Sequence, residues 1–164
     1  EKSFSCNFNM LINGRPRVLG IKQILAEWLS WRRSCVRRET AFDLQKNQER
    51  MHLLKGLEKI LLDIDKAVKI IRETSRASEV VPNLCEGFEI DEIQAEYVAD
   101  IRLRNLNRQY ILERVADIKD LAGKIKNLKD ILEDPEKIDT LITENLHDVI
   151  RKYSKPRRDF KKTP

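Results

Sequence analysis

Glycine, proline, cysteine and aromatic residues are all scarce in this chain of 164 residues, and each scarcity excludes a class of structure. Five glycines, five prolines and 6 % aromatic residues are too few for the turns and cores of a β-sandwich or barrel. Three widely spaced cysteines without a Cys-x-x-Cys pair predict neither a disulfide framework nor a zinc site. The 36 % of charged residues favours a protein of long helices.

Long apolar runs and targeting signals are also missing. No apolar stretch approaches the ~18 residues that a membrane span needs, and no signal peptide is recognisable. Free cysteines are typical of a reducing compartment. We therefore expect a cytoplasmic protein that makes no membrane contact. Because the first residue is not Met and both ends are polar, we also expect the chain to be a piece of a longer polypeptide.

Motifs that carry chemistry are absent from the sequence as well. There is no phosphate-binding glycine loop, no Gly-x-Ser-x-Gly and no His-Glu-x-x-His. His52 and His147 are too far apart to form a local ligand pair, and acidic pairs such as Asp63/Asp65 are what an exposed helix offers. Tyr97 falls on the apolar face of its helix, which favours packing over nucleophilic chemistry. We expect no catalytic, cofactor-binding or metal-binding residue in this chain.

The net charge of +5 permits contact with nucleic acid without requiring it. The most basic patch holds four arginines over two helical turns, namely Arg32, Arg33, Arg37 and Arg38. These side chains could contact DNA phosphates, pair with acids of a facing helix, or keep an exposed helix soluble. Trp28 and Trp31 precede the patch and are expected to be buried anchors.

The first fifty-six residues predict a hairpin followed by a long helix. Asn13-Gly14 between two short apolar runs is a strong signal for a two-residue hairpin turn within residues 8–19. No glycine or proline then interrupts residues 21–55, and a helix of that length would span about 52 Å. The register that starts at Trp28, Trp31 and Cys35 becomes polar further along, so we expect this second half to be exposed.

A second long helix is predicted over residues 109–133. Its apolar positions alternate in steps of three and four as in a coiled coil, at Ile111, Ile118, Leu121, Ile125, Leu128 and Leu132, with Arg114 as the one polar interruption. We expect it to pair antiparallel with the first helix, as a two-helix arm. A parallel dimer through the same seam is the alternative.

Between these helices the sequence predicts a small helical region, and after them a final helix. Apolar periodicity predicts a helix over residues 57–71, a break with a short turn or helix over 74–89, and a helix that Asp91 caps. Asp134 and Pro135 are good N-cap and first-turn residues for a last helix over 135–153. A basic tail follows.

Two motifs give this arrangement a family resemblance. Residues 50–57 (RMHLLKGL) and 91–107 (DEIQAEYVADIRLRNLN) resemble the exit-gate region of the A subunit of bacterial type IIA topoisomerases, which are gyrase and topoisomerase IV. Further similar stretches lie at residues 14–19, 22–25, 32–44, 131–132 and 157–159. Together the similar segments extend over nearly all of residues 8–160.

The resemblance implies a mainly α fold: a long antiparallel two-helix coiled-coil arm with a helical knob at its tip and a short N-terminal β-hairpin. The implied divisions are the tower end with its hairpin (1–20), the first arm helix (21–56), the knob (57–107), the return helix (108–134), and the final helix with its basic tail (135–164). It also implies a two-fold dimer contact, the exit gate or C-gate, through the knob residues Ile93, Tyr97, Ile101, Leu103 and Leu106.

The partners and chemistry implied by the resemblance lie mostly outside this chain. The chain would form a homodimer, join an ATPase B subunit in a heterotetramer and act on duplex DNA during ATP-dependent supercoiling or decatenation. The nucleophilic tyrosine, ATP and Mg²⁺ would belong to other domains. The competing hypothesis is a free-standing helical DNA-binding or adaptor protein that uses the arginine-rich helix.

Overall fold

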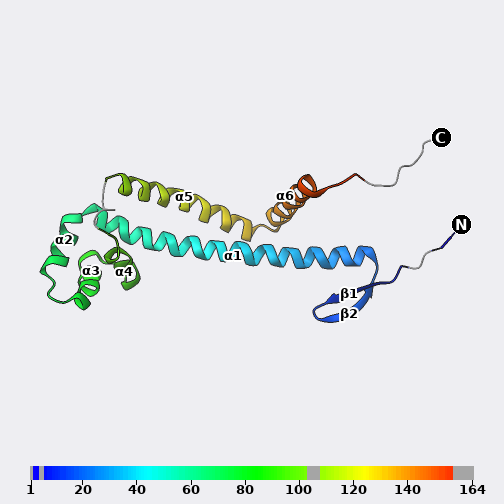
Figure 1. Ribbon diagram of the computed structural model, residues 1–164, viewed down its shortest axis with the longest axis horizontal. Coiled ribbons are helices and arrows are strands. Elements are labelled where there is room, and N and C mark those ends of the chain that lie inside the picture. Colours follow the sequence, from blue (N-terminus) through cyan, green and yellow to red (C-terminus); the bar gives the residue numbers. More distant parts are fainter. Residues whose placement is uncertain (1, 4–5, 103–107, 157–164) are drawn as a thin grey trace. The chain divides into compact units, whose positions relative to one another are not determined.

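The computed structural model describes residues 2–3, 6–102 and 108–156, and it is mainly helical (Figure 1). The described residues form a two-stranded hairpin, six α-helices and one 3₁₀ turn. They fall into two compact units. The first unit comprises Glu1–Thr40 and Ile131–Pro164, and the second comprises Ala41–Asp130. Helix α1 (Ile21–Leu62) contributes its first half to the first unit and its second half to the second unit.

The hairpin of the first unit has the predicted turn. Strands β1 (Phe8–Ile12) and β2 (Arg15–Leu19) pair antiparallel, with Ile12 opposite Arg15. Asn13 and Gly14 have φ angles of 51° and 75°, the left-handed values that a type I′ turn needs at both central positions. The prediction of a hairpin at Asn13-Gly14 is therefore confirmed.

The hairpin and the start of α1 together line an apolar cleft of about 260 Å³. Trp28 and Trp31 lie on its helical side and are 39 % and 58 % exposed. The prediction that these residues are buried anchors is therefore wrong within this unit. The buried apolar residue of this part of α1 is Val36, at 1 % exposure, because it faces helix α6 (Pro135–Tyr153) while the two tryptophans face the hairpin.

Helix α6 completes the first unit and has the predicted bounds. The Asp134 carboxylate accepts a hydrogen bond from the Glu136 backbone N–H at 2.9 Å, and Pro135 occupies the first turn, as expected. Ile138 and Ile142 pack against Val36. Leu29, Ile131 and Leu141 surround them and are partly buried. This cluster is the core of the first unit.

The sequence predicted that the first long helix ends at Gly56, but α1 continues to Leu62. A mid-helix glycine costs about 1 kcal/mol relative to alanine, so its local preference argues for a helix end. Tertiary packing overrides that preference because the Gln94 side chain packs against Gly56. The Asp63 carboxylate then accepts from the Lys66 N–H at 3.1 Å and starts α2 (Ile64–Glu73). The single helix predicted over residues 57–71 is thus divided at Asp63.

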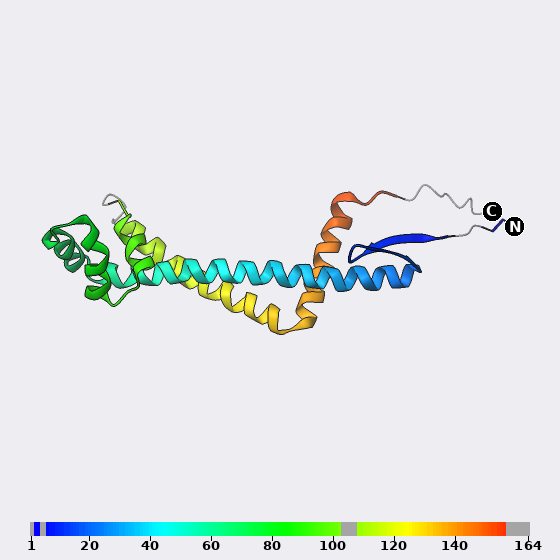
Figure 2. The same cartoon turned by 90° about the horizontal axis from the view of Figure 1, so that it is seen from below.

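In the second unit, α5 (Arg108–Glu133) runs antiparallel beside the second half of α1 (Figure 1 and Figure 2). Met51, Leu54 and Leu57 of α1 pack with Leu121 of α5 in one buried cluster. Ile118 and Ile125 are partly buried against the same cluster, one turn before and one turn after Leu121. The predicted seam of α5 is confirmed at these three positions. A coiled-coil arm that carries a knob stays a prediction, as do its division boundaries.

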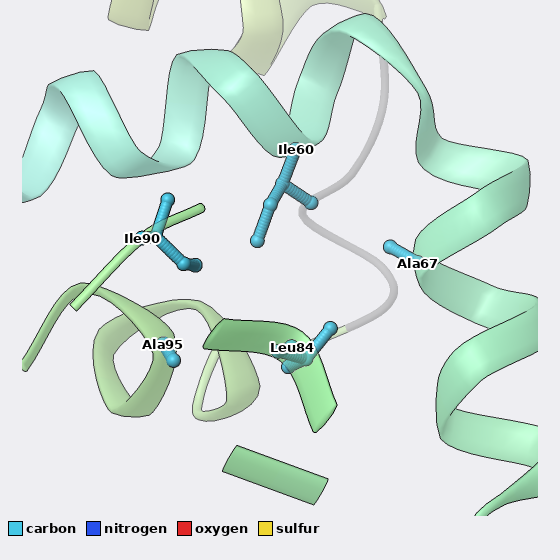
Figure 3. Packing of buried hydrophobic residues seen from close by; sticks show 5 residues of the cluster. All are labelled: Ile60, Ala67, Leu84, Ile90 and Ala95. Carbon is cyan, nitrogen blue, oxygen red and sulfur yellow. The ribbon is translucent and has the colours of Figure 1, made fainter. Parts of the chain in front are cut away.

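A second core of this unit is built from its short helices (Figure 3). After the turn η1 (Ala77–Glu79), α3 (Val80–Phe88) and α4 (Glu92–Ala99) follow in close succession. Ile60 of α1 points toward Ile90, Leu84 and Ala95, and Ala67 of α2 closes the cluster from the other side. The expected break, short helix and capped helix over residues 74–99 are all present.

Candidate functional site

The two sequence motifs that carry the family resemblance meet in the second unit. The Gln94 side-chain amide of α4 donates to the backbone carbonyl of His52 in α1 at 2.7 Å. The same amide nitrogen lies 3.4 Å from His52 Nδ1. A Cβ placed on Gly56 would lie 2.6 Å from the Gln94 Cβ, which is closer than atoms of real side chains approach. Gln94 therefore packs directly on the glycine backbone, and only glycine leaves room for it.

Asp91 adds a contact with the His52 ring and a helix cap to this junction. Its carboxylate accepts from the Gln94 backbone N–H at 2.9 Å, and it lies 2.5 Å from His52 Nε2. The Gln94 side-chain oxygen accepts in return from the Asp91 N–H at 3.4 Å, which completes a capping box. The bond from the Gln94 N–H holds the pKa of Asp91 below its usual value, and His52 lowers it further against the opposing effect of partial burial.

The predicted interface residues in α4 and just after it have different environments. Ile93 is 65 % exposed, whereas its neighbours Gln94 and Ala95 are buried. Tyr97 and Ile101 are partly buried and pack against the Met51, Leu54 and Leu57 cluster, so they also belong to the core of their own unit. Leu103 and Leu106 lie outside the described residues. Among the described members of the set, Ile93 has the most freely accessible side chain.

Tyr97 brings α4 beside the start of α5. Its side chain contacts Tyr110. Burial raises the pKa of Tyr110, and the neighbouring Tyr97 raises it further. The Arg114 guanidinium lies over the Tyr110 ring, 5.0 Å from the ring centre. Arg114 also pairs with Asp117 at 2.8 Å. Leu112, in the first turns of this helix, is 61 % exposed.

The four arginines of the basic patch have different environments in the first unit. Arg33 makes two hydrogen bonds to the Asp139 carboxylate, both at 2.6 Å, so one of the predicted alternatives, pairing with an acid of a facing helix, holds for this residue. Arg37 and Arg38 are exposed, and Arg32 is partly exposed. Arg38 also donates to the Cys35 sulfur at 3.4 Å. A shallow groove is lined by Ser30, Arg33, Ser34, Arg37 and Arg38.

The sequence identified the two motifs, but it assigned no role to Gln94 and did not predict that Asp139 pairs with Arg33. The spacing Asp91-x-x-Gln94 before an apolar stretch is a capping-box signature and could have identified the first. Nothing in the sequence pairs Arg33 with Asp139.

Among residues 2–3, 6–102 and 108–156, no group of three or more His, Cys, Asp or Glu side chains could hold a metal ion. No helix in those ranges has the length and apolarity to span a bilayer.

Comparison with known proteins assigns the family. The family model for the A subunit of DNA gyrase/topoisomerase IV matches residues 1–147. The chain belongs to this family. Its relatives include the DNA gyrase A subunit of Streptococcus pyogenes, 34 % identical over 96 % of this chain and 19 % of the relative. The corresponding protein of Borreliella burgdorferi is also 34 % identical, over 96 % of this chain and 20 % of the relative.

The family extends to plant organelles. A chloroplastic/mitochondrial DNA gyrase A subunit of Nicotiana benthamiana is 34 % identical over 98 % of this chain and 17 % of the relative. The chain thus spans about a fifth of the length of the relatives it matches. The resemblance inferred from residues 50–57 and 91–107 is confirmed at the level of the gyrase/topoisomerase IV A-subunit family.

Proposed function

We propose that this chain is the exit-gate dimerisation module of a type IIA topoisomerase A subunit. Family membership supports the class of enzyme. The observation that carries the gate assignment is Ile93, which is 65 % exposed on α4 although Ala95, two residues on, is fully buried. Tyr97 links α4 to the start of α5, where Leu112 is 61 % exposed. Apolar side chains exposed as one contiguous patch favour a protein contact, and the proposal places Ile93 and Leu112 in such a patch.

In the proposed gate, two copies meet about a two-fold axis through the residues around α4. A two-fold contact is self-complementary, so a modest apolar patch on each copy suffices. Ile93 would lie at the centre, with Tyr97 and Ile101 contributing their exposed edges. The proposed contact also includes Leu103 and Leu106, which lie outside the described residues. The knob would comprise residues 57–107, and residues 21–56 and 108–134 would be coiled-coil arms that space the gate from the rest of the enzyme.

The remainder of the reaction would take place elsewhere in the enzyme. The nucleophilic tyrosine, the Mg²⁺ site and the ATPase of the B subunit would lie in other domains of a heterotetramer. This module would open to release a duplex during ATP-dependent supercoiling or decatenation in the cytoplasm. On its own it would neither cleave DNA nor hydrolyse ATP.

Sedimentation of the chain over a wide concentration range tests the gate. We expect a reversible dimer that Ile93→Glu abolishes, because each copy would bring a charge into the two-fold contact. Ile71→Glu on α2 is the matched control, since Ile71 is also exposed, at 43 %, and lies outside the proposed contact. A monomer at every concentration, or equal effects of the two substitutions, would contradict the proposal.

Contact with DNA through the basic patch is a second candidate function. Arg37 and Arg38 are exposed beside Ser34, whereas Arg33 is engaged by Asp139, so the first two would make the phosphate contacts, with Arg32 next to them. Arg37→Ala should lower the salt slope of duplex binding by about one, and Arg72→Ala on α2 serves as the control. Steep binding by a chain that stays monomeric would instead favour a free-standing DNA-binding or adaptor protein.

A further inference from the structure

The junction of α1 and α4 contains a buried polar side chain and a mid-helix glycine, neither of which is required for apolar core packing. Gln94 is only 8 % exposed, and its amide reaches the main chain of α1 rather than solvent. Its aliphatic stem lies on the Cα of Gly56. A glycine in the middle of α1 and a buried amide on α4 thus fit together, and each is unfavourable without the other.

This junction fixes the direction in which α4 presents its side chains. Helix α4 has eight residues, too few for a stable helix in isolation, so its position depends on its tertiary contacts. Successive residues of a helix point about 100° apart. Since Gln94 and Ala95 are held inward, Ile93 must point away from them, toward solvent.

A hydrogen bond sets this orientation more narrowly than apolar contact would. The bond from Gln94 to the His52 carbonyl is directional, and donor angles far from linear weaken it steeply. His52 contributes a second restraint, because its ring lies against Gln94 and pairs with the helix-capping Asp91. An aliphatic residue in place of Gln94 could fill the same volume but would allow α4 to rotate or slide.

We propose that Gln94, His52 and Gly56 form a positioning joint that orients α4 for the dimer contact. This inference rests on the exit-gate function proposed above. The three residues act through α4 and do not themselves cross the two-fold. Loss of the joint weakens the closed gate by changing the direction of Ile93, while the apolar core around Leu84 and Ala95 keeps the unit folded.

Gln94→Met is the decisive substitution because it keeps the side-chain volume and removes the donor. We expect its dimer dissociation constant to rise about tenfold or more, equivalent to about 1.4 kcal/mol, with faster amide exchange confined to α4. Gln48→Met is the matched control, since Gln48 is an exposed residue of α1. Urea unfolding of each variant checks that the comparison is made between folded chains.

A second variant separates loss of the donor from any general disturbance of packing. In Gln94→Glu a carboxylate faces the His52 carbonyl at neutral pH, so we expect weak dimerisation there. At a pH low enough to protonate this acid, it can donate to the carbonyl, and affinity should recover toward that of the wild type. His52, Asp91, Glu92 and the nearby Lys55 are present in both proteins, so the wild type measured at each pH is the reference against which the dissociation constant of Gln94→Glu is compared.

The outcomes distinguish the joint from the gate. A wild-type chain that never dimerises overturns the exit-gate function, and with it the gate role of the joint. A dimer that Ile93→Glu abolishes but Gln94→Met leaves at wild-type strength overturns the joint alone. Weak dimerisation of Gln94→Glu that does not recover at low pH also overturns it, since the donor would then not be what matters.

Discussion

Arg33 and Asp139 lie 106 positions apart in the chain and are joined by two hydrogen bonds of 2.6 Å. The guanidinium presents two N–H groups to both carboxylate oxygens, a geometry that lysine cannot reproduce. The pair lies beside the buried cluster of Val36, Ile138 and Ile142. Its partners are 48 % and 43 % exposed, so it contributes modestly to stability and chiefly fixes the register of α6 against α1.

The first prediction concerns pH. The hydrogen bonds and charge of Arg33 hold the pKa of Asp139 below its usual value. A carboxyl group whose folded pKa is lowered stabilises the fold above its unfolded pKa of about 3.9, and this contribution is lost as pH falls through the lower folded value. Wild type should therefore be more stable than Asp139→Asn near neutral pH, and the two should converge in acid.

Urea unfolding of both proteins from neutral pH down to the acid limit measures this difference. Asp91, whose pKa is also lowered, is present in both chains and cancels in the comparison. A difference in stability that stays constant with pH would mean that the substitution acts through packing rather than through the ion pair.

The second prediction compares two helical glycines. Gly56→Ala should destabilise the chain by about 1–3 kcal/mol, because the added Cβ would meet the Gln94 side chain at 2.6–2.8 Å. Gly123→Ala should stabilise it by about 0.5–1 kcal/mol, because nothing lies within 4 Å of its added Cβ. Urea unfolding measures both. Opposite signs are expected, and a stabilising Gly56→Ala would show that the helices are not in contact at this glycine.

The third prediction concerns the core between α1 and α5. Leu57 is fully buried against Leu121 and its neighbours, so Leu57→Ala should cost about 2–5 kcal/mol. Leu62→Ala is the control on the same helix, since Leu62 is 83 % exposed and its truncation should change stability by no more than about 0.5 kcal/mol. Similar losses from the two substitutions in urea unfolding would contradict the assigned burial.

The fourth prediction concerns the cap of α6. Asp134→Ala removes the acceptor of the Glu136 N–H and should destabilise the first unit by about 1 kcal/mol. Asp134→Ser keeps an acceptor at this position and should recover most of the loss. Tryptophan fluorescence is the suitable probe because both tryptophans lie in the first unit. If serine gave no recovery, the cap would not be what the aspartate contributes.

Local signals in the sequence determined the ends of several elements. The turn at Asn13-Gly14, the cap at Asp91 and the start of α6 at Asp134-Pro135 depend on backbone angles and hydrogen bonds within a few residues, so composition and spacing suffice to predict them. The seam of α5 was likewise predictable at Ile118, Leu121 and Ile125, because the helical period alone groups these residues on one face. These features need no partner to be specified.

Tertiary structure decided which partner each face meets. The sequence indicated a helix end at Gly56 and buried tryptophans, but the closeness of Gln94 carries α1 through the glycine, and Val36 rather than Trp28 or Trp31 is buried. It also grouped Ile93 with Tyr97 in one interface, whereas the fold exposes the first and packs the second. A helical period states that one face is apolar, but only contacts between residues distant in sequence determine what covers it.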